Sequence, residues 1–446
     1  MDTEAAYNKA LDYLYSFVDY SLKHTSELVK AEFNLDRMFV LMDLLGNPQN
    51  AYPIIHVAGT KGKGSTSALM ASALRAAGYT AGLYISPHLQ DFCERIQVDG
   101  EPIQHGDPSG RASGQSLAAL VEEIKPAVAT IPFITTFELT TALAFLYFQR
   151  RGVNAAVIEV GLGGRLDATN IVTPLVSVIT SLSYDHMAVL GNTLAAIAAE
   201  KAGIIKEGKP VISSPQKEEA LQVLERVAKE RHAPLTLVGR DVTYTPLSRS
   251  LEGQTFQLSN LSTCALKIPL LGAYQVENAA TAYAALKASG LNVSDEAIQK
   301  GFAEVQWPCR FEIVRREPPV ILDSAHNIDS AEKLRQALED YFPNRPVILI
   351  FGASEDKDVP GMFAVWKPRL SLIIATKADH PRALEPGGLV ETADRLGLRA
   401  EAVNPVETAL ARALELSEKD GSIVLTAGSM FVTAEVKTAW QKIGHG

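Results

Sequence analysis

The sequence has few cysteines and no long apolar segment. Its three cysteines, Cys93, Cys264 and Cys309, are widely spaced and odd in number. This pattern fits neither a disulfide framework nor a zinc site, and it favours a reducing compartment. No segment approaches the ~20 apolar residues that span a bilayer, and the first residues lack the basic and apolar regions of a secretory signal. These absences predict a cytoplasmic protein that has no membrane partner.

An excess of positive charge is also missing. The chain has 42 Lys and Arg residues against 51 Asp and Glu residues, a formal net charge of −9 at pH 7, so nucleic acid is not expected as a partner. Anionic ligands must instead be held by local groups. Hydrophobic residues make up 47% of the chain, as in globular proteins, and 446 residues exceed the size of one ordinary domain. We therefore expect two domains.

Short apolar runs alternate with helical stretches from residue 54 onward, which predicts a parallel sheet with helices on its faces. The expected strands are 54–58, 81–85, 155–160, 175–180 and 210–213, and the expected helices are 65–77, 137–151, 193–202 and 276–288. Helical spacing within residues 3–45 predicts helices that cover the sheet. The less periodic, polar residues 240–268 predict an antiparallel excursion, and residues 107–115, with Gly, Pro and Ser, predict a mobile loop.

The strand and helix series restarts near residues 307–310. Further strands are expected at 320–323, 346–351, 372–376 and 423–426. This restart places the domain boundary between residues 308 and 309, so that residues 1–308 form one domain and residues 309–446 a second, smaller one.

A glycine-rich segment joins the first expected strand to the helix that follows it. Its residues are Gly59, Thr60, Lys61, Gly62, Lys63, Gly64, Ser65 and Thr66. Glycines allow backbone N–H groups to turn towards phosphate oxygens, the helix N-terminus adds positive potential, and Lys63 supplies a mobile cation. The spacing departs from the standard phosphate loop, because Gly64 separates Lys63 from Ser65. A merely tight strand-to-helix connection is the alternative, and nucleotide binding is favoured over it.

Other motifs follow in order along the chain. They are SPHL at 86–89, TTFE at 135–138, EVGLGGRLDATN at 159–170, DH at 185–186, EKAGIIK at 200–206, Gln275 with Asn278, WPCR at 307–310, and Asp323 with AHN at 325–327. Together with the glycine-rich loop, this set resembles the folylpolyglutamate synthase/dihydrofolate synthase family of the Mur ligase superfamily over about residues 50–430. The resemblance implies an α/β fold with an N-terminal, P-loop-type, mostly parallel sheet flanked by helices, and a smaller Rossmann-like C-terminal domain.

The function that the resemblance implies is ATP-dependent ligation of L-glutamate to dihydropteroate, to a reduced folate polyglutamate or to both, through an acyl phosphate, in folate biosynthesis and retention. It implies a monomer and two magnesium ions, one of them held with the help of a carbamylated Lys201. ATP contacts are implied at Thr60, Lys61, Gly62, Lys63, Gly64, Ser65, Asn278, Arg310, Asp323 and His326. Magnesium ligands are implied at Ser86, Glu159, His186 and Lys201, catalytic roles at Lys63, His186 and Lys201, and substrate contacts at Thr135, Thr136, Phe137 and Arg165.

The residues themselves give these assignments partial support. Ser86 and Glu159 lie at or near the carboxyl ends of apolar strands, the edge where open α/β sheets bind ligands. A lone histidine such as His186 is more often structural, and Lys201 taken alone reads as a solvated helix lysine. Hydroxyls before a helix commonly serve as caps. Two other functions stay open, a Mur-type ligase of peptidoglycan precursors and an ATP-binding regulatory protein without catalysis.

Overall fold

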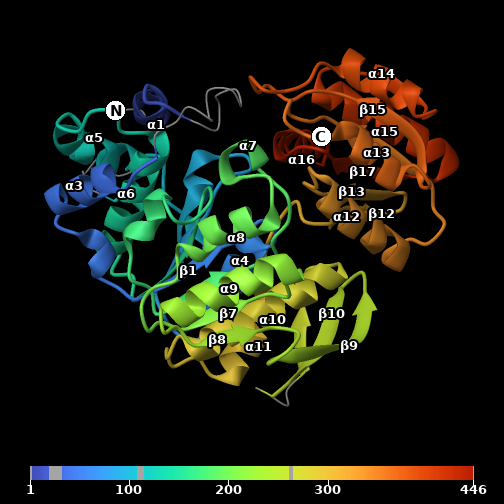
Figure 1. Ribbon diagram of the computed structural model, residues 1–446. Helices are drawn as coiled ribbons and strands as arrows, with labels where there is room; N and C mark the ends of the chain where they lie inside the picture. Colours follow the sequence, from blue (N-terminus) through green and yellow to red (C-terminus); the bar gives the residue numbers. More distant parts are fainter. Residues whose placement is uncertain (1–2, 20–32, 108–114, 261–264, 445–446) are drawn as a thin grey trace.

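The computed structural model describes residues 3–19, 33–107, 115–260 and 265–444. Within these ranges the strands form three sheets, of eight, three and six strands. Figure 1 shows the large sheet with its helices beside a smaller α/β body that contains the C-terminus. Most of the loop expected at 107–115 lies outside the described residues.

The eight-stranded sheet has the order β4-β3-β2-β5-β1-β6-β7-β8. Its strands are β1 (Ile54–Ala58), β2 (Ala81–Tyr84), β3 (Ile96–Val98), β4 (Glu101–Pro102), β5 (Ala155–Glu159), β6 (Val176–Ile179), β7 (Val211–Ser213) and β8 (Leu235–Leu237). Pairing is parallel except at β2–β3 and β3–β4. In the central strand β1 every residue is buried, because helices cover both faces, and this explains the continuous apolar run in the sequence.

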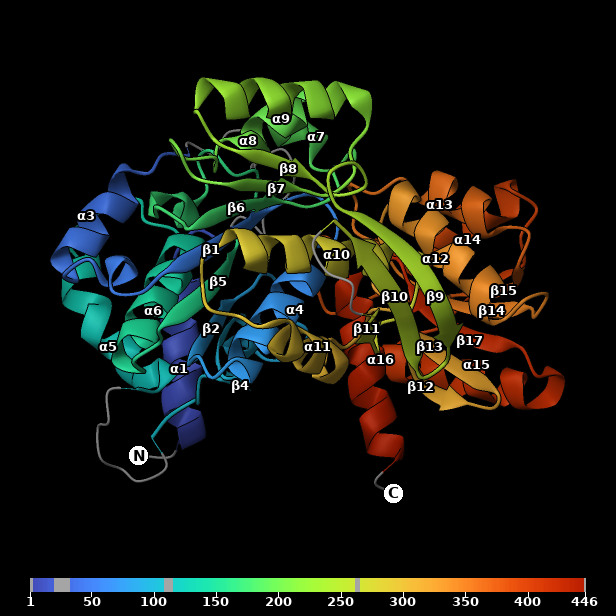
Figure 2. The same ribbon diagram turned by 90° about the horizontal axis from the view of Figure 1, so that it is seen from below.

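Helices cover this sheet on both faces. One face packs against α4 (Lys63–Ala76), α10 (Ala273–Ala288) and α11 (Asp295–Glu304). The other face packs against α1 (Thr3–Tyr15), α3 (Asp36–Leu44), α5 (Leu117–Val128) and α6 (Thr136–Arg150), and next to them lie α7 (Met187–Leu190), α8 (Leu194–Ala202) and α9 (Glu218–Glu230). Figure 2 shows α4, α10 and α11 together beneath the sheet, away from α1, α5 and α6. Short 3-10 turns occur at Pro48–Asn50, Phe92–Arg95 and Ala168–Ile171.

The middle of the chain forms the antiparallel excursion that the sequence predicts. It consists of β9 (Thr243–Ser250), β10 (Gly253–Ser259) and β11 (Ala265–Ile268), in the order β11-β10-β9. Phe256, Leu258 and Leu266 pack into the same core as α4 and α10, so this small sheet extends the large one's helical face.

The six-stranded sheet has the order β12-β13-β17-β14-β15-β16 and is parallel apart from β12–β13. Its strands are β12 (Glu312–Arg316), β13 (Pro319–Leu322), β14 (Val347–Phe351), β15 (Leu370–Ala375), β16 (Ala400–Ala402) and β17 (Ile423–Ala427). Helices α12 (Ile328–Tyr341), α13 (Val359–Trp366) and α14 (Pro386–Arg395) cover one face, and α15 (Val406–Asp420) and α16 (Met430–Ile443) cover the other.

The expected fold class is thereby confirmed, with a mostly parallel sheet followed by a smaller Rossmann-like one. The domain boundary between residues 308 and 309 remains a prediction, and the second large sheet begins three residues after it, at Glu312. In the described part of the chain, no helix combines the length and the apolar character needed to span a membrane.

Candidate active site

A cavity opens at the carboxyl ends of β1, β2 and β5 and receives residues from both α/β parts. The residues that the motifs assign to ATP and to magnesium all line it: Thr60, Lys61, Gly62, Lys63, Gly64, Ser65, Ser86, Glu159, His186, Lys201, Asn278, Arg310, Asp323 and His326. These residues lie as many as 266 positions apart in the sequence, from residue 60 to residue 326, so the fold alone brings them together.

The glycine-rich loop runs from β1 into α4. Gly62 is the N-cap of α4 with φ +83°, and a β-carbon there would lie 2.2 Å from Asn278 Oδ1. A β-carbon at Gly59 would lie 1.8 Å from Thr180 Oγ1, so both positions require glycine. The N–H groups of Thr60 and Lys61 both donate to the Ser181 carbonyl at 3.0 Å, which fixes the loop. The first N–H groups of α4 have no partner within their own helix and are available to an anion.

Lys63 and Glu159 form an ion pair inside the cavity. Lys63 Nζ lies 3.6 Å from Glu159 Oε1, and the Ser86 N–H donates to Glu159 Oε2 at 3.4 Å. Burial raises the pKa of the Glu159 carboxyl, and the Lys63 charge opposes this rise. The strand end therefore presents a buried carboxylate, a hydroxyl and a lysine to the same space.

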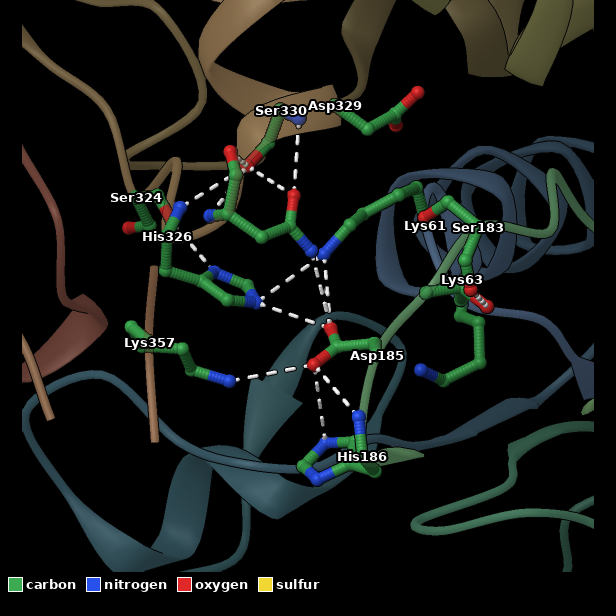
Figure 3. A network of polar contacts seen from close by, with 12 residues as sticks. Lys61, Lys63, Ser183, Asp185, His186, Ser324, His326, Asp329, Ser330 and Lys357 are labelled. Atoms are coloured by element: carbon green, nitrogen blue, oxygen red, sulfur yellow. Dashed lines mark hydrogen bonds and ion pairs between the residues drawn. The ribbon is translucent and has the colours of Figure 1, made fainter. Parts of the chain in front are cut away.

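Asp185 is the centre of a network that joins the two α/β parts (Figure 3). Its carboxylate lies 3.1 Å from Lys61 Nζ and 3.3 Å from Lys357 Nζ, and it accepts from Asn327 Nδ2 at 3.3 Å. His326 Nε2 lies 3.6 Å from the same carboxylate. Burial works against ionisation, but these partners hold the pKa of Asp185 well below its usual range. The network thus fixes the C-terminal part against the phosphate loop.

His186 follows Asp185 at the N-terminus of α7. Its φ of 49° lies in the left-handed region, which is uncommon for a residue with a side chain. The backbone N–H of His186 donates to Asp185 Oδ1 at 3.0 Å, and this bond holds the turn. Although 40% of the His186 side chain is exposed, desolvation at the cavity edge and the nearby charges of Lys357 and Lys201 lower the pKa of its ring to about 4, so the ring is neutral at pH 7. A neutral ring can offer a nitrogen lone pair to a ligand.

Lys201 projects from α8 into the cavity and is only 5% exposed. Among the residues that the structure describes, its ammonium group has no ion-pair partner. Burial, together with the nearby charge of Lys63, lowers the pKa of Lys201 to about 7. The solvated helix lysine that the isolated sequence suggested is therefore not what the fold produces.

The C-terminal part contributes a second wall. Asp323 follows β13, and its two carboxylate oxygens accept from the N–H groups of Ala325 and Phe311, each at 2.8 Å. Burial raises the pKa of Asp323 to about 6, against the effect of the Arg310 charge. The Gln275 side-chain nitrogen is buried beside Asn278, and no described residue is its hydrogen-bond partner. Such polar groups are suited to a ligand that supplies the missing partners.

Comparison with known proteins identifies the architecture. Residues 111–286 match the family described as Mur ligase middle domain, and residues 309–430 match the Mur ligase, glutamate ligase domain. The dihydrofolate synthase/folylpolyglutamate synthase of Bacillus subtilis is 36% identical over 415 residues, which cover 90% of this chain and 94% of that protein. This chain belongs to the folylpolyglutamate synthase/dihydrofolate synthase family. It is accordingly a ligase that forms C–N bonds.

Solved structures of this family agree over almost the whole chain. Folylpolyglutamate synthase from Mycobacterium tuberculosis complexed with ADP superposes with a TM-score of 0.87 at 32% identity, covering 98% of each chain. Escherichia coli FolC in complex with DHPP and ADP gives a TM-score of 0.81 at 32% identity, covering 96% of this chain and 100% of that one.

The four residues assigned to the acceptor substrate lie outside the residues that line the cavity. Thr135 is the N-cap of α6 in a capping box with Glu138, and the Thr136 hydroxyl donates to the Leu14 carbonyl at 2.9 Å. Arg165 is exposed and pairs with Glu200 at 2.9 Å. Phe137 packs behind the cavity wall, where a β-carbon on Gly161 would lie 2.4 Å from its ring. Their substrate roles in this ligase stay predictions.

Lys357 is a site residue that sequence reasoning missed. It lies in a charged segment after β14 that is typical of a solvated loop, yet its side chain is only 13% exposed and its Nζ lies 3.3 Å from Asp185 and 3.0 Å from Asp356. No local sequence pattern identifies this residue, because residues 185 and 357 come together only when the two parts of the ligase pack against each other.

Replacing Asp185 with asparagine is expected to lower the free energy of unfolding by about 3–5 kcal/mol, because it removes the anion from a largely buried set of cations. Urea unfolding measures this change. Glu200→Gln is the matched control, since it removes a carboxylate whose partner Arg165 is exposed and should cost less than about 1 kcal/mol. Equal effects of the two variants would contradict the role of Asp185 as the centre of the network.

Proposed function

We propose that this protein joins L-glutamate to dihydropteroate, to a reduced folate polyglutamate or to both, with ATP as the phosphoryl donor. One observation carries the proposal: a single cavity joins the glycine-rich loop and Lys63 to Glu159, His186 and Lys201 of the first part and to the Arg310–His326 wall of the second. The ADP complexes of related proteins support ATP as the nucleotide.

In this proposal the glycine-rich loop binds the phosphates of ATP. The N–H groups of Lys63, Gly64 and Ser65 at the start of α4 face the anion, and Lys63 supplies the charge that balances the transferred phosphoryl group. Arg310 offers a planar donor to phosphate, and Asp323 accepts from a hydroxyl or amino group of the nucleotide. Thr60, Lys61, Gly62, Asn278 and His326 complete the nucleotide contacts.

The donor set beside Lys63 fits magnesium. Glu159 provides a buried carboxylate and Ser86 a hydroxyl, both hard oxygen ligands, while His186 adds a neutral ring nitrogen. Two bound magnesium ions would neutralise phosphate charge during transfer. The protein's own contribution is that Lys63 and the Ser86 N–H favour the ionised form of Glu159, against the rise in its pKa that burial causes, which prepares the carboxylate to bind a cation.

We further propose that Lys201 carries a carbamate and acts as an anion towards the second ion. Formation of a carbamate requires the neutral amine, which adds carbon dioxide and releases a proton to solvent. A pKa near 7 gives Lys201 a large neutral fraction at pH 7, unlike an ordinary lysine. Its lack of an ion-pair partner in the described structure leaves the amine accessible from the cavity.

The reaction then has two steps. A carboxylate oxygen of the folate acceptor attacks the γ-phosphorus of ATP, and ADP leaves, which gives an acyl phosphate. The amine of glutamate attacks the carbonyl carbon, phosphate leaves with the bridging oxygen, and the amine proton passes to solvent. Because an acyl phosphate hydrolyses readily, the cavity must exclude water, and the Asp185 network holds the two parts closed around it.

The remaining assignments belong to the same proposal. Thr135, Thr136, Phe137 and Arg165 contact the folate acceptor, the ligase is a monomer and it acts in the cytoplasm. The position of Phe137 directly behind Gly161, a residue that lines the cavity, supports an acceptor site on that side. Kinetics of Phe137→Ala test it, because KM for the acceptor should rise while KM for ATP stays unchanged.

Phosphate release from ATP tests the proposed function. Purified protein is supplied with magnesium and glutamate plus dihydropteroate or tetrahydrofolate, and products are identified by mass. Release that requires both acceptor and glutamate, with one glutamate added, supports the proposal, and the acceptor used assigns one activity or both. Activity only with a nucleotide-linked peptidoglycan precursor, or nucleotide binding without acceptor-dependent release, would contradict it.

A further inference from the structure

A second group of chemically reactive side chains lies away from the cavity, where α1 packs against the segment between β2 and α5. Asp91 and Cys93 flank the start of the 3-10 turn Phe92–Arg95, and His105 follows β4. One possible ligand atom from each of Asp91, Cys93 and His105 lies within 4.8 Å of the others. None of the three lines the ATP cavity.

Neighbouring groups orient each of these side chains. Asp91 Oδ1 accepts from the Cys93 N–H at 2.7 Å and from the Tyr7 hydroxyl at 3.3 Å, which turns Oδ2 towards His105 Nε2 at 2.7 Å. The other ring nitrogen, His105 Nδ1, lies 3.4 Å from Glu4 Oε2. The Tyr7 ring stacks on the His105 ring at 3.7 Å with an angle of 2° between the planes. The imidazole therefore has a fixed orientation.

We propose that Asp91, Cys93 and His105 bind one divalent transition-metal ion of the zinc type, with Glu4 hydrogen-bonded to the metal-bound histidine. A thiolate, an imidazole and a carboxylate are the donors that zinc takes in proteins, and three protein ligands leave a fourth position for water. A histidine bound to metal almost always donates its other N–H to a carboxylate or carbonyl group, and Glu4 occupies that place.

The distances suit such a site after a small rearrangement, in which His105 Nε2 and Asp91 Oδ2, now 2.7 Å apart, separate as the ion replaces their hydrogen bond, and wider pairs, at most 4.8 Å apart, close. Ligand atoms of a tetrahedral zinc ion lie about 3.3–3.7 Å apart, given bond lengths of about 2.0–2.3 Å. The Cys93 thiol must lose its proton to solvent when the metal ion binds, and burial raises the pKa of that thiol when no metal is present. Metal affinity should consequently rise with pH. The cysteine spacing did not reveal this site because only one of its ligands is a cysteine.

A metal ion at this site would restrain residues 86–91, which belong to the first α/β part and contact the second. Leu89 packs against the core of the C-terminal sheet, and Gln90 Nε2 donates to Thr438 Oγ1 on α16 at 2.6 Å. Both residues lie between Ser86, at the cavity, and Asp91, at the proposed metal site. The site would tie this segment to α1.

Cobalt(II) titration of the full-length protein tests the proposal. The protein is purified without a histidine tag and stripped with a chelator, and thiolate-to-cobalt charge-transfer absorption is followed. We expect the wild type to bind one equivalent of cobalt that gives this absorption, and one equivalent of zinc to remove it. The control variant Cys309→Ala, which keeps Cys93, should behave in the same way. Cys93→Ala should lose the absorption, and Glu4→Gln should weaken cobalt binding by about 10–100-fold.

Three results would overturn the proposal. They are the absence of charge-transfer absorption at saturating cobalt, its persistence in Cys93→Ala, and cobalt binding that only His186→Ala removes, which would assign the ion to the ATP cavity. If Cys93→Ala does not fold, Glu4→Gln and His105→Gln decide the matter, because both side chains are partly exposed. Unchanged cobalt affinity in both variants would also contradict the site.

Discussion

Lys63→Met is expected to lower kcat for acceptor- and glutamate-dependent ATP cleavage by about 10²–10³-fold. The variant removes the cation that lies at the start of α4 and 3.6 Å from Glu159, where charge develops during phosphoryl transfer. Loss of one such preorganised group typically costs this factor. The variant should also melt at a lower temperature, because it leaves the buried Glu159 carboxylate without its nearest cation.

The control for this variant is Lys217→Met. Lys217 is exposed and precedes α9, so its replacement should change neither kcat nor stability beyond about 0.5 kcal/mol. Steady-state phosphate release and thermal unfolding of the two variants give the comparison. A Lys63→Met protein that keeps more than a tenth of the wild-type kcat would contradict the role of Lys63 in phosphoryl transfer.

Lys201→Met is expected to stabilise the fold and abolish most of the activity. Lys201 is buried and has no ion-pair partner among the described residues, which is costly for an ammonium group, and methionine fills similar volume without the charge. We expect the free energy of unfolding at pH 7 to rise by about 1–3 kcal/mol. Lys63→Met and Lys201→Met thus have opposite effects on stability and the same effect on catalysis. With ¹³C-labelled bicarbonate, the wild type should show one protein-bound carbamate signal that Lys201→Met lacks.

The stabilisation by Lys201→Met should depend on pH. The pKa of Lys201 is about 7 in the folded protein and 10.5 in its reference state. Between these values the unfolded chain binds one proton more than the folded protein, so wild-type stability gains about 1.4 kcal/mol per pH unit from this residue. The advantage of Lys201→Met is therefore largest at or below pH 7 and mostly gone by pH 9. Urea unfolding in buffer free of carbon dioxide measures it, and a constant difference would contradict the lowered pKa.

The strands that carry the site could be predicted from the sequence because they are buried on both faces. Strand β1 was expected at 54–58 and has those bounds, and β5 and β6 differ from expectation by one or two residues. Strand β3 and the edge strand β12 were not predicted. β3 has only three residues, and β12 contains three charged residues, so neither gives a clear strand pattern, and both are held by antiparallel pairing with β2 and β13.

In the site, too, residues at strand and helix ends could be predicted from the sequence, and contacts between distant parts of the chain could not. The residues assigned to ATP and magnesium lie at strand ends and helix starts, where motif and sheet topology together place them in one cavity. The role of Asp185 as an interdomain centre required the positions of Lys61, His326 and Lys357, which no spacing rule relates. Likewise, the cluster around Cys93 depends on His105 and on α1, which is remote in sequence.

Transfer of oxygen from the acceptor's carboxylate to phosphate tests the central claim most directly. The acceptor is prepared with both oxygens of its reactive carboxylate labelled with ¹⁸O, and the protein turns it over with ATP, magnesium and glutamate. The account predicts one ¹⁸O atom in each phosphate released and one retained in the new amide. Phosphate that contains no label while the glutamylated product forms would show that the folate-side carboxylate is not activated by phosphoryl transfer, and would contradict the account.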